Sequence, residues 1–379
     1  MNLRLIATTA FGVEAVCKRE IEALGYSIVS TENGKITYLS DETGLVKSNL
    51  WLRTADRVFV EIGSFKAITF DELFEKTQRL PWEEWIDETG AFPVNGTSVK
   101  STLFSLSDCQ AIIKKAVVTR LKSHYHQEWF DETGPTYPIR FTLYNDIVTL
   151  MIDTSGESLH KRGYRKEAIA APLKETLAAS MVLLSYWRND RTLVDYFCGS
   201  GTILIEAALI GRNIAPGLYR DFNACHWPCL KTSLWDQERL RAKLAQNPSG
   251  SLSLKGFDID PDVIEKAKKN ANYAGVKNDI TFAVQDFLKP IFVEPYGIWI
   301  SNPPYGDRLE KDTDLEPLYR VITKRIDSWS TWSIYLLTPK QEYMMKIKRP
   351  IGRKRKFYNG NIETNYYQFY GPNPHKLND

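Results

Sequence analysis

The chain has 379 residues, of which 43% are hydrophobic and 25% are charged. This size and composition suit two or three folded domains and exclude a largely disordered chain. The five scattered cysteines predict no disulfide framework and favour a reducing compartment. The sequence shows neither a leader-like start nor an apolar run of roughly 18 residues, so we expect a cytoplasmic protein without a membrane anchor.

The charge is unevenly distributed along the chain. Residues 1–160 carry 16 Lys and Arg against 22 Asp and Glu, a balance of −6, whereas residues 161–379 carry 33 against 24, a balance of +9. If the partner is a polyanion, the basic second half should make most of the phosphate contacts. The acidic first half would then recognise its partner by shape.

The first 155 residues predict a small α+β region without a catalytic constellation, which we interpret as a binding or positioning module. Hydrophobic periodicity and turn residues predict its elements. These are strands at Leu3–Thr8, Ser27–Val29, Lys35–Leu39, Arg57–Phe65, 139–144 and 147–153, and helices from Phe11 to Leu24 and at 44–54, 70–78 and 107–123.

From Leu173 onwards the pattern changes to long helices that alternate with short, continuous apolar strands. This alternation predicts an α/β, Rossmann-like domain with a parallel sheet covered on both faces. The predicted strands are Thr192–Phe197, Leu254–Asp258, Ile280–Val284, Gly297–Ser301 and Ser333–Thr338. Residues 212–250, rich in Pro, Trp and charged residues, are interpreted as a partly helical insertion.

A candidate cofactor loop follows the first of these strands. Ligands of open α/β sheets bind at the carboxyl ends of the strands, and glycines let the backbone approach them. Ile205 replaces the third glycine of the dinucleotide fingerprint, which disfavours a pyrophosphate. An acidic residue before the glycines suits S-adenosylmethionine, whose ammonium Asp195 would bind directly or through water; a tight turn without a ligand is the alternative. The candidate cofactor residues of this loop are Asp195, Cys198, Gly199, Ser200, Gly201 and Thr202.

The ends of the next two strands add further cofactor candidates. Asp258 could accept both ribose hydroxyls, with Ile259 beside it. Asp260 suits the N-cap of a helix that starts at Pro261, although the two aspartates could exchange roles. Asp286 could bind the adenine amino group and Phe287 could lie against the ring, the alternative being a solvated turn.

The sequence Asn302-Pro303-Pro304-Tyr305 ends the fourth strand. The two prolines fix the backbone, so the Asn302 side-chain oxygen and the Pro303 carbonyl can form a rigid pair of acceptors for a planar NH2 group. Holding both hydrogens favours a tetrahedral nitrogen whose lone pair points at a methyl carbon. Tyr305 would stack on the base. We therefore expect these four residues to be catalytic, with Asn302 also at the cofactor; a simple turn is the alternative.

Residues 195–202 and 302–305, with the extension Gly306–Leu309, resemble those of bacterial THUMP-domain class I methyltransferases that modify guanine N2 in 23S ribosomal RNA. The resemblance is to the N-terminal half of a fused enzyme, and we expect the activity of its second half to be absent. It implies an RNA-binding region at 1–155, with a ferredoxin-like unit up to about 60 and a THUMP domain at about 44–155. A linker at 156–172 and a methyltransferase domain at 173–379 would follow. The implied substrate is 23S rRNA or a large-subunit precursor.

Two basic segments are candidate RNA contacts. The resemblance identifies residues 159–165 as the family's linker motif, and the run 346–356 has seven basic residues in eleven. A solvated linker and a solvated hairpin are the alternatives. The candidate RNA-binding residues are Lys161, Arg162, Tyr164, Arg165, Arg353, Lys354 and Arg355.

Other activities remain open from the residues alone. Any planar NH2 group fits the same acceptors, so adenine N6 in RNA or DNA and a protein glutamine amide are alternatives to guanine. A non-catalytic RNA-binding factor for ribosome assembly is a further alternative. No metal is expected, because Cys225 and Cys229 have no second ligand pair at a spacing that would complete a zinc site.

Overall fold

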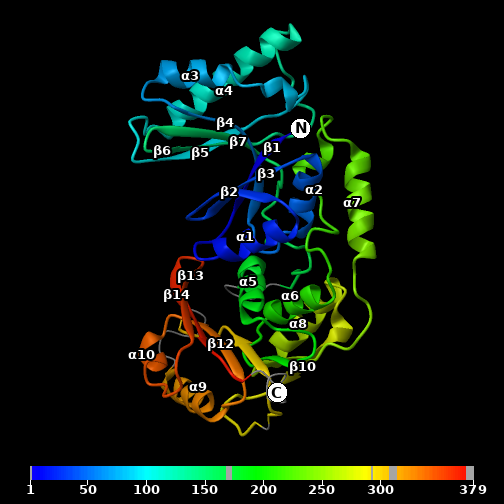
Figure 1. The fold of residues 1–379 in the computed structure, drawn as a ribbon, viewed down its shortest axis with the longest axis vertical. Coiled ribbons are helices and arrows are strands. Elements are labelled where there is room, and N and C mark those ends of the chain that lie inside the picture. Colours follow the sequence, from blue (N-terminus) through cyan, green and yellow to red (C-terminus); the bar gives the residue numbers. More distant parts are fainter. Residues whose placement is uncertain (1, 168–172, 292, 307–313, 373–379) are drawn as a thin grey trace. The chain divides into compact units, whose positions relative to one another are not determined.

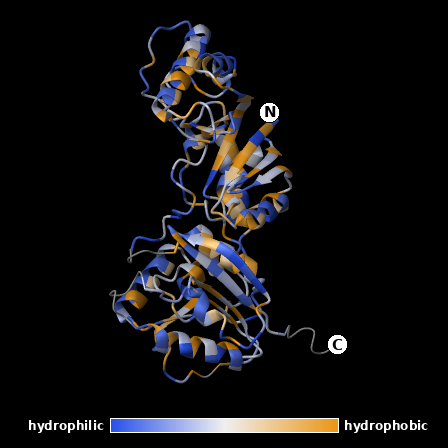
Figure 2. Cartoon of the chain, turned by 90° about the vertical axis from the view of Figure 1, so that its left-hand side faces the viewer, coloured by the Kyte–Doolittle hydropathy of each residue, from blue (hydrophilic) through white to orange (hydrophobic). Residues whose placement is uncertain are grey.

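The computed structural model describes residues 2–167, 173–291, 293–306 and 314–372 (Figure 1). The chain forms two compact units: the first contains residues 1–8, 18–159 and 220–241, and the second contains residues 9–17, 160–219 and 242–379. Hydropathy colouring shows apolar stretches along strands and mixed colours along many helices (Figure 2). None of the helices in the described ranges has both the length and the apolar character needed to cross a bilayer.

The first unit contains a seven-stranded sheet in the order β2-β3-β1-β4-β7-β6-β5. All neighbouring strands are antiparallel except β5 and β6, which are parallel. The first six elements give the β-α-β-β-α-β order of a ferredoxin-like unit. In chain order the elements are β1 (Leu3–Thr8), α1 (Glu14–Ala23), β2 (Ser27–Glu32), β3 (Lys35–Ser40), α2 (Glu42–Trp51), β4 (Arg57–Lys66), α3 (Phe70–Gln78), η1 (Trp82–Glu84), β5 (Val94–Val99), α4 (Leu106–Tyr125), β6 (Ile139–Tyr144) and β7 (Ile147–Asp153).

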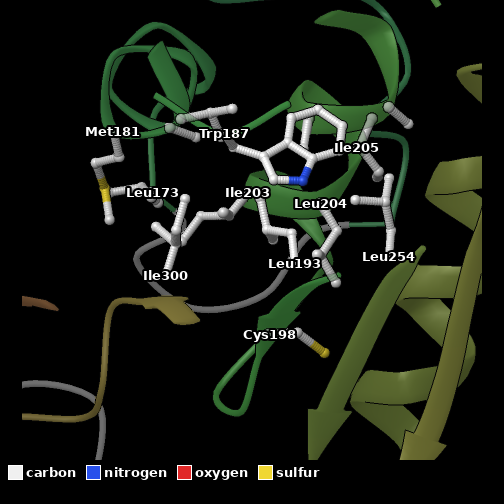
Figure 3. Packing of buried hydrophobic residues seen from close by; sticks show 14 of the residues in the cluster. Leu173, Met181, Trp187, Leu193, Cys198, Ile203, Leu204, Ile205, Leu254 and Ile300 are labelled. Carbon is white, nitrogen blue, oxygen red and sulfur yellow. The ribbon is translucent and has the colours of Figure 1, made fainter. Parts of the chain in front are cut away.

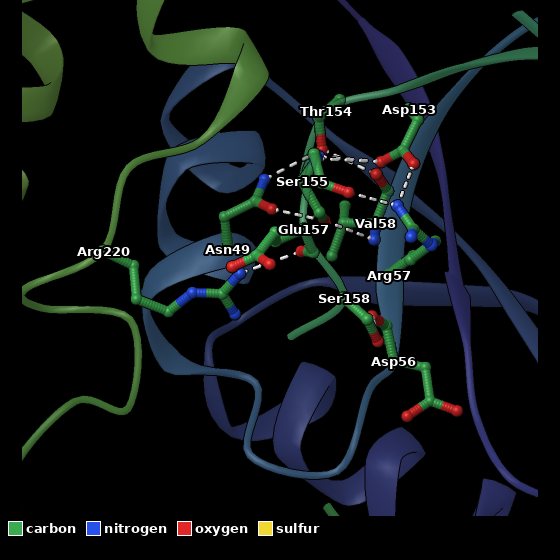
Figure 4. A network of polar contacts seen from close by, with 11 residues as sticks. Asn49, Asp56, Arg57, Val58, Asp153, Thr154, Ser155, Glu157, Ser158 and Arg220 are labelled. Atoms are coloured by element: carbon green, nitrogen blue, oxygen red, sulfur yellow. Dashed lines mark hydrogen bonds and ion pairs between the residues drawn. The ribbon is translucent and has the colours of Figure 1, made fainter. Parts of the chain in front are cut away.

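Buried polar contacts hold this unit together around the end of β7 (Figure 4). The Asn49 amide on α2 donates to Thr154 Oγ1 at 2.9 Å and accepts from Ser155 Oγ at 2.7 Å. Arg57 on β4 forms an ion pair with Asp153. Arg220, from the segment read as an insertion, donates to the carbonyl of Glu157 at 2.8 Å, so this part of the insertion packs with the first unit.

The second unit contains a seven-stranded sheet in the order β10-β9-β8-β11-β12-β14-β13. The first five strands are parallel, whereas β14 is antiparallel to both of its neighbours. In chain order the elements after β7 follow, among which η2 and most of α7 belong to the first unit. They are α5 (Glu175–Ser185), β8 (Leu193–Asp195), α6 (Thr202–Gly211), η2 (Asn223–His226), α7 (Thr232–Leu244), β9 (Leu254–Asp258), α8 (Pro261–Tyr273), η3 (Lys277–Asp279), β10 (Ile280–Val284), β11 (Ile298–Ser301), α9 (Glu316–Ser328), β12 (Ser333–Thr338), α10 (Gln341–Met344), β13 (Arg353–Asn359) and β14 (Ile362–Phe369).

Apolar clusters pack on both faces of the second sheet. One includes Leu177 of α5, Leu204 of α6 and Ile300 of β11, and Figure 3 shows several of its members. The other includes Trp299 of β11 and Ile322 of α9. The continuous apolar strands of the sequence are therefore buried from both sides, as expected for an α/β fold. This packing fixes the strand ends that carry the candidate site.

The structure confirms the predicted fold class and differs from the expected elements at two places. The short strand β5 was not expected, because Asn95, Gly96 and Ser98 are poor strand formers. A side chain at position 96 would approach the carbonyl oxygen of Phe141 to 2.3 Å, which explains the glycine. The five strands predicted from the sequence are parallel as expected, and the hairpin β13–β14 adds an antiparallel edge that was not predicted.

Candidate active site

The candidate site lies where the strand order of the second sheet reverses. Strands β8 and β11 are parallel neighbours, and their carboxyl ends carry Asp195 and Ser301. Ligands of open α/β sheets bind at such a reversal, outside the carboxyl ends of the strands. A small pocket at this edge combines residues from the two strand ends with residues of the loop after β8. Its lining consists of Leu173, Asp195, Phe197, Cys198, Gly199, Ser200, Thr202, Ile203 and Asn302.

The loop after β8 makes a tight turn into α6. Gly199 and Gly201 have positive φ angles of 53° and 82°. The Gly201 N–H donates to the Cys198 carbonyl at 2.8 Å. A Cβ atom at Gly201 would lie only 3.0 Å from the Phe282 ring and 3.2 Å from Ala267. Both the backbone conformation and the close packing therefore require glycine at position 201.

Asp195 is buried at the end of β8, with 1% of its surface exposed. Its Oδ1 accepts hydrogen bonds from Ser301 Oγ at 2.6 Å and from the Phe197 N–H at 3.0 Å. Both donors contact the same carboxylate oxygen. Burial raises the pKa of the carboxyl to about 7. A cationic ligand group would favour the ionised form and could bind the second oxygen.

Asp258 and Asp260 have different surroundings at the end of β9. Asp258 accepts from the Gly199 N–H at 3.0 Å, so it joins the strand end to the glycine loop. Burial raises its pKa. Asp260 caps α8 by accepting from the Asp262 N–H at 2.8 Å, which confirms the predicted N-cap. Ile259 between them is 65% exposed and could lie against an apolar ligand surface.

The Asn302 side chain is the strongest sign of a ligand site. It is 5% exposed, yet neither Oδ1 nor Nδ2 has a hydrogen-bond partner in the described part of the chain. Leaving such a buried polar atom unsatisfied costs about 1–3 kcal/mol. Native proteins rarely retain this cost without a functional reason. The amide is therefore suited to donate to and accept from a bound molecule.

The rest of the Asn302–Tyr305 motif is supported by neighbouring elements. The Pro304 carbonyl accepts from Tyr319 Oη of α9 at 3.2 Å. Tyr305 is 7% exposed, and its hydroxyl accepts from Asn359 Nδ2 of β13 at 2.6 Å. The motif is thus held from two sides. Acceptance by the Pro303 carbonyl and stacking by Tyr305 stay predictions.

Comparison with known proteins decides the family. Residues 162–368, more than half of the chain, match the family model described as RMKL-like, methyltransferase domain. The chain belongs to this family. Residues 4–59 match the RlmL ferredoxin-like domain, and residues 67–153 match the THUMP domain. The resemblance to THUMP-domain methyltransferases is therefore confirmed.

Relatives of this RMKL-like methyltransferase match almost its whole length. It is 45% identical over 371 residues to the Bacillus subtilis (strain 168) protein named "Putative RNA methyltransferase YpsC", covering 97% of this chain and 95% of the relative. A crystal structure from Listeria monocytogenes, described as a "predicted N6-adenine-specific DNA methylase", has a TM-score of 0.92 and 44% identity over 98% of this chain and 97% of that chain. The structure of SMU.472 complexed with SAH has a TM-score of 0.92 and 40% identity over 98% and 99% of the two chains.

S-adenosylmethionine is the cofactor of this methyltransferase family member, and the described side chains fit it. The cofactor has an ammonium for a carboxylate such as Asp195 and two ribose hydroxyls for one such as Asp258. The loop 199–201 brings backbone close to the same pocket as the Asn302 amide. Each of these particular contacts stays a prediction.

Two predicted cofactor residues have other contacts in the methyltransferase unit. Asp286 is half-buried and accepts from the Leu288 N–H at 2.9 Å. Phe287 is buried in an aromatic cluster, and the Arg325 guanidinium lies 4.0 Å from the centre of its ring. The Phe287 ring therefore packs against protein groups, and its contact with an adenine ring stays a prediction.

The structure gives three predicted RNA contacts in the linker motif a different role. Arg162 lies 3.5 Å from Glu206 and Tyr164 donates to the same carboxylate at 3.0 Å, all within the protein interior. Arg165 pairs with Glu175 at 3.3 Å. Arg162 and Tyr164 are buried and cannot reach a phosphate in this conformation, so the RNA expectation for them is corrected to an internal role. Arg165 is half-buried, and its contact with RNA stays a prediction.

The remaining basic candidates are accessible. Lys161 is exposed, as are Arg353 and Lys354 on the edge strand β13, whereas Arg355 is half-buried. The basic run thus forms a hairpin, and charged residues on an edge strand also discourage pairing with other chains. Contact of these residues with RNA stays a prediction. Asp307–Leu309 of the sequence motif lie outside the described residues.

Several supporting roles were missed by the sequence interpretation. Ser301 orients Asp195, Arg165 donates to Thr202 Oγ1 at 3.2 Å, and Glu206 neutralises the linker. Glu206 could have been noticed, because it is the one charged residue in the apolar helix Thr202–Gly211. Burial raises the pKa of Glu175 to about 7 against the opposing effect of Arg165.

The Cys225–Cys229 segment packs without forming a ligand cluster. Trp227 stacks on Tyr137 with ring centres 5.0 Å apart, and His226 lies 2.7 Å from Asp221. In the described ranges, no three His, Cys, Asp or Glu side chains gather so that they could hold a metal ion.

Proposed function

We propose that this protein transfers a methyl group from S-adenosylmethionine to the exocyclic amine of a base in RNA, and that the base is guanine, methylated at N2, in 23S rRNA. The buried, unpartnered Asn302 amide carries this proposal. It lies in the same pocket as Asp195 and the glycine loop. The uncharged Asn302 side chain offers an acceptor oxygen, and the uncharged, planar NH2 group of a base has hydrogens that such an acceptor can bind.

The protein's part in the reaction is to position the amine. The bound cofactor supplies a methyl carbon made electrophilic by its positive sulfur. Asn302 Oδ1 accepts one amine hydrogen, and a second acceptor such as the Pro303 carbonyl takes the other. This arrangement withdraws the nitrogen lone pair from the ring and directs it out of the base plane. The methylated nitrogen is acidic, so it can release its proton without a strong general base.

Three observations support RNA as the substrate. The chain contains a THUMP domain and a ferredoxin-like domain of the RlmL type. A relative with 45% identity is named as an RNA methyltransferase. The methyltransferase half of the sequence is basic, with a balance of +9 over residues 161–379. Guanine N2 and 23S rRNA follow from the motif resemblance.

Methylation of adenine N6 is the second candidate. The similar structure from Listeria monocytogenes is described as an N6-adenine-specific DNA methylase. Adenine N6 and guanine N2 present the same planar NH2 group, so the Asn302 acceptor does not distinguish them. The THUMP domain favours RNA over DNA as the polymer.

The experiment offers labelled S-adenosylmethionine and the purified full-length protein to three polymers from cells lacking this enzyme: 23S rRNA, 16S rRNA and genomic DNA. Nucleosides are then separated after digestion. We expect label in N2-methylguanosine from 23S rRNA alone. Label in N6-methyladenosine would show that the target base is adenine and contradict the guanine assignment. Label in DNA would contradict the RNA assignment. No label in any polymer would contradict the proposed activity.

A further inference from the structure

Two exposed aromatic side chains meet near the Asn302–Tyr305 motif. The rings of Phe11 and Tyr358 are arranged edge to face, with their centres 5.8 Å apart and their planes 78° apart. They remain 42% and 36% exposed. Phe11 belongs to the segment 9–17, which is part of the same compact unit as β13 and Tyr358. We call Phe11 and Tyr358 the aromatic pair.

Close backbone packing holds the pair together. Gly12 has a φ of 88°, and a Cβ atom there would lie 2.3 Å from the carbonyl oxygen of Lys356 and 3.0 Å from the Phe357 ring. Only glycine allows this approach to β13. The Gly12 N–H is satisfied by Glu14 Oε2 at 2.9 Å. The backbone of the segment that carries Phe11 is therefore packed closely against β13, which places Phe11 beside Tyr358.

The hairpin connects the aromatic pair to the catalytic motif. Asn359, the residue after Tyr358, donates to the Tyr305 hydroxyl at 2.6 Å. Tyr305 ends the motif that begins at Asn302. Tyr358 of the aromatic pair is therefore next in sequence to a residue that contacts the candidate catalytic motif.

Basic residues of β13 accompany the aromatic pair. Lys356 Nζ lies 5.4 Å from the centre of the Tyr358 ring and also pairs with Glu363 at 2.6 Å. Arg353 and Lys354 are exposed on the same strand. Exposed aromatic rings flanked by cations are the usual means of binding single-stranded nucleic acid, because bases stack on the rings and phosphates contact the charges.

We propose that the aromatic pair is a stacking platform for a nucleotide next to the target base, with its phosphate near Lys356. This inference rests on the proposed RNA substrate. An enzyme that takes a base out of its stack leaves the neighbouring bases without a partner, and an aromatic surface replaces the lost stacking. The platform binds any base, so it contributes affinity for the substrate strand and leaves base choice to the pocket.

The test compares the full-length protein with the double variants Phe11→Leu/Tyr358→Leu and Phe11→Ala/Tyr358→Ala. Leucine keeps apolar packing and removes the flat ring. We expect the KM for RNA to rise about 5- to 150-fold, the range for losing one stacked base, with kcat and S-adenosylmethionine affinity within twofold. Unchanged KM in a leucine variant that still binds S-adenosylmethionine would overturn the platform, as would a loss confined to kcat.

Tyr273→Ala is the matched control. Tyr273 is also an exposed tyrosine with a lysine over its ring, Lys166 at 4.6 Å, but it lies at the end of α8. We expect its KM for RNA to stay unchanged, and an equal rise there would overturn the special role of the aromatic pair.

A binding measurement separates this proposal from the proposed function. A fluorescent single-stranded oligoadenylate is titrated with wild-type protein and the leucine variant, without any methyl transfer. Weaker binding by the variant supports the platform even if wild-type protein methylates no RNA, and equal binding overturns it even if methylation is observed.

Discussion

The buried carboxyl of Asp195 predicts a pH-dependent affinity for S-adenosylmethionine. Burial raises its pKa from the ordinary value of about 3.8 to about 7. A carboxyl with a pKa of about 7 is mostly protonated below that pH and mostly ionised above it, and only the ionised form attracts the cofactor's ammonium. The ionised fraction rises from roughly one in eleven at pH 6 to about three in four at pH 7.5, so the Kd should fall about eightfold over this range.

Isothermal titration at constant ionic strength between pH 6 and 7.5 measures this dependence. The range stops at pH 7.5 because an α-amino group has a pKa of about 7.7–8.0 and loses most of its positive charge above that pKa. Asp195→Asn should bind more weakly at pH 7.5 and show no slope. Glu175→Gln is the control, since Glu175 also has a pKa of about 7 but pairs with Arg165, and its slope should persist. A wild-type Kd constant within twofold, or a slope retained in Asp195→Asn, would refute the reasoning.

Three further predictions concern the strand ends and the linker. Asp258→Ala should weaken cofactor binding in titration about 10-fold or more, as expected for losing hydrogen bonds to a charged group, whereas Asp260→Ala should lose only about 1 kcal/mol of stability as an N-cap. In urea unfolding, Gly201→Ala should lose clearly more stability than Gly250→Ala, because both have a φ of 82° but only Gly201 has close neighbours. Glu206→Ala should lose about 3–5 kcal/mol, because it removes the buried carboxylate that pairs with Arg162; a loss below about 1 kcal/mol would contradict the internal ion pair.

The sequence predicted the fold where local pattern and tertiary packing agree. Short, continuous apolar strands such as Ile298–Ser301 are buried from both faces, so their length and apolar composition were sufficient to identify them. The Asp260–Pro261 helix start was equally local. By contrast, β5 contains Asn95, Gly96 and Ser98, and its strand conformation depends on parallel pairing with β6, which no local pattern reveals.

The candidate site also contains residues whose role the local sequence predicts and residues whose role depends on tertiary contacts. The residues at strand ends, Asp195, Asp258 and Asn302, could be predicted because parallel strands bring their carboxyl ends to one edge. The internal role of the linker motif could not be predicted, because Arg162 contacts Glu206, which is 44 residues away in the sequence. Basic residues look alike in sequence whether they face solvent or a buried carboxylate. Only the tertiary structure separates the two cases.

The central claim is that the Asn302 amide holds the substrate amine. Its most direct test measures, for Asn302→Ala, both methyl transfer to RNA from cells lacking the enzyme and the Kd for S-adenosylmethionine. The account predicts that transfer falls at least about 100-fold, in the range seen when one positioned polar group is lost from an active site, while the Kd changes less than about threefold. Transfer close to the wild-type rate would contradict the account, and so would loss of cofactor binding that explains the whole loss of transfer.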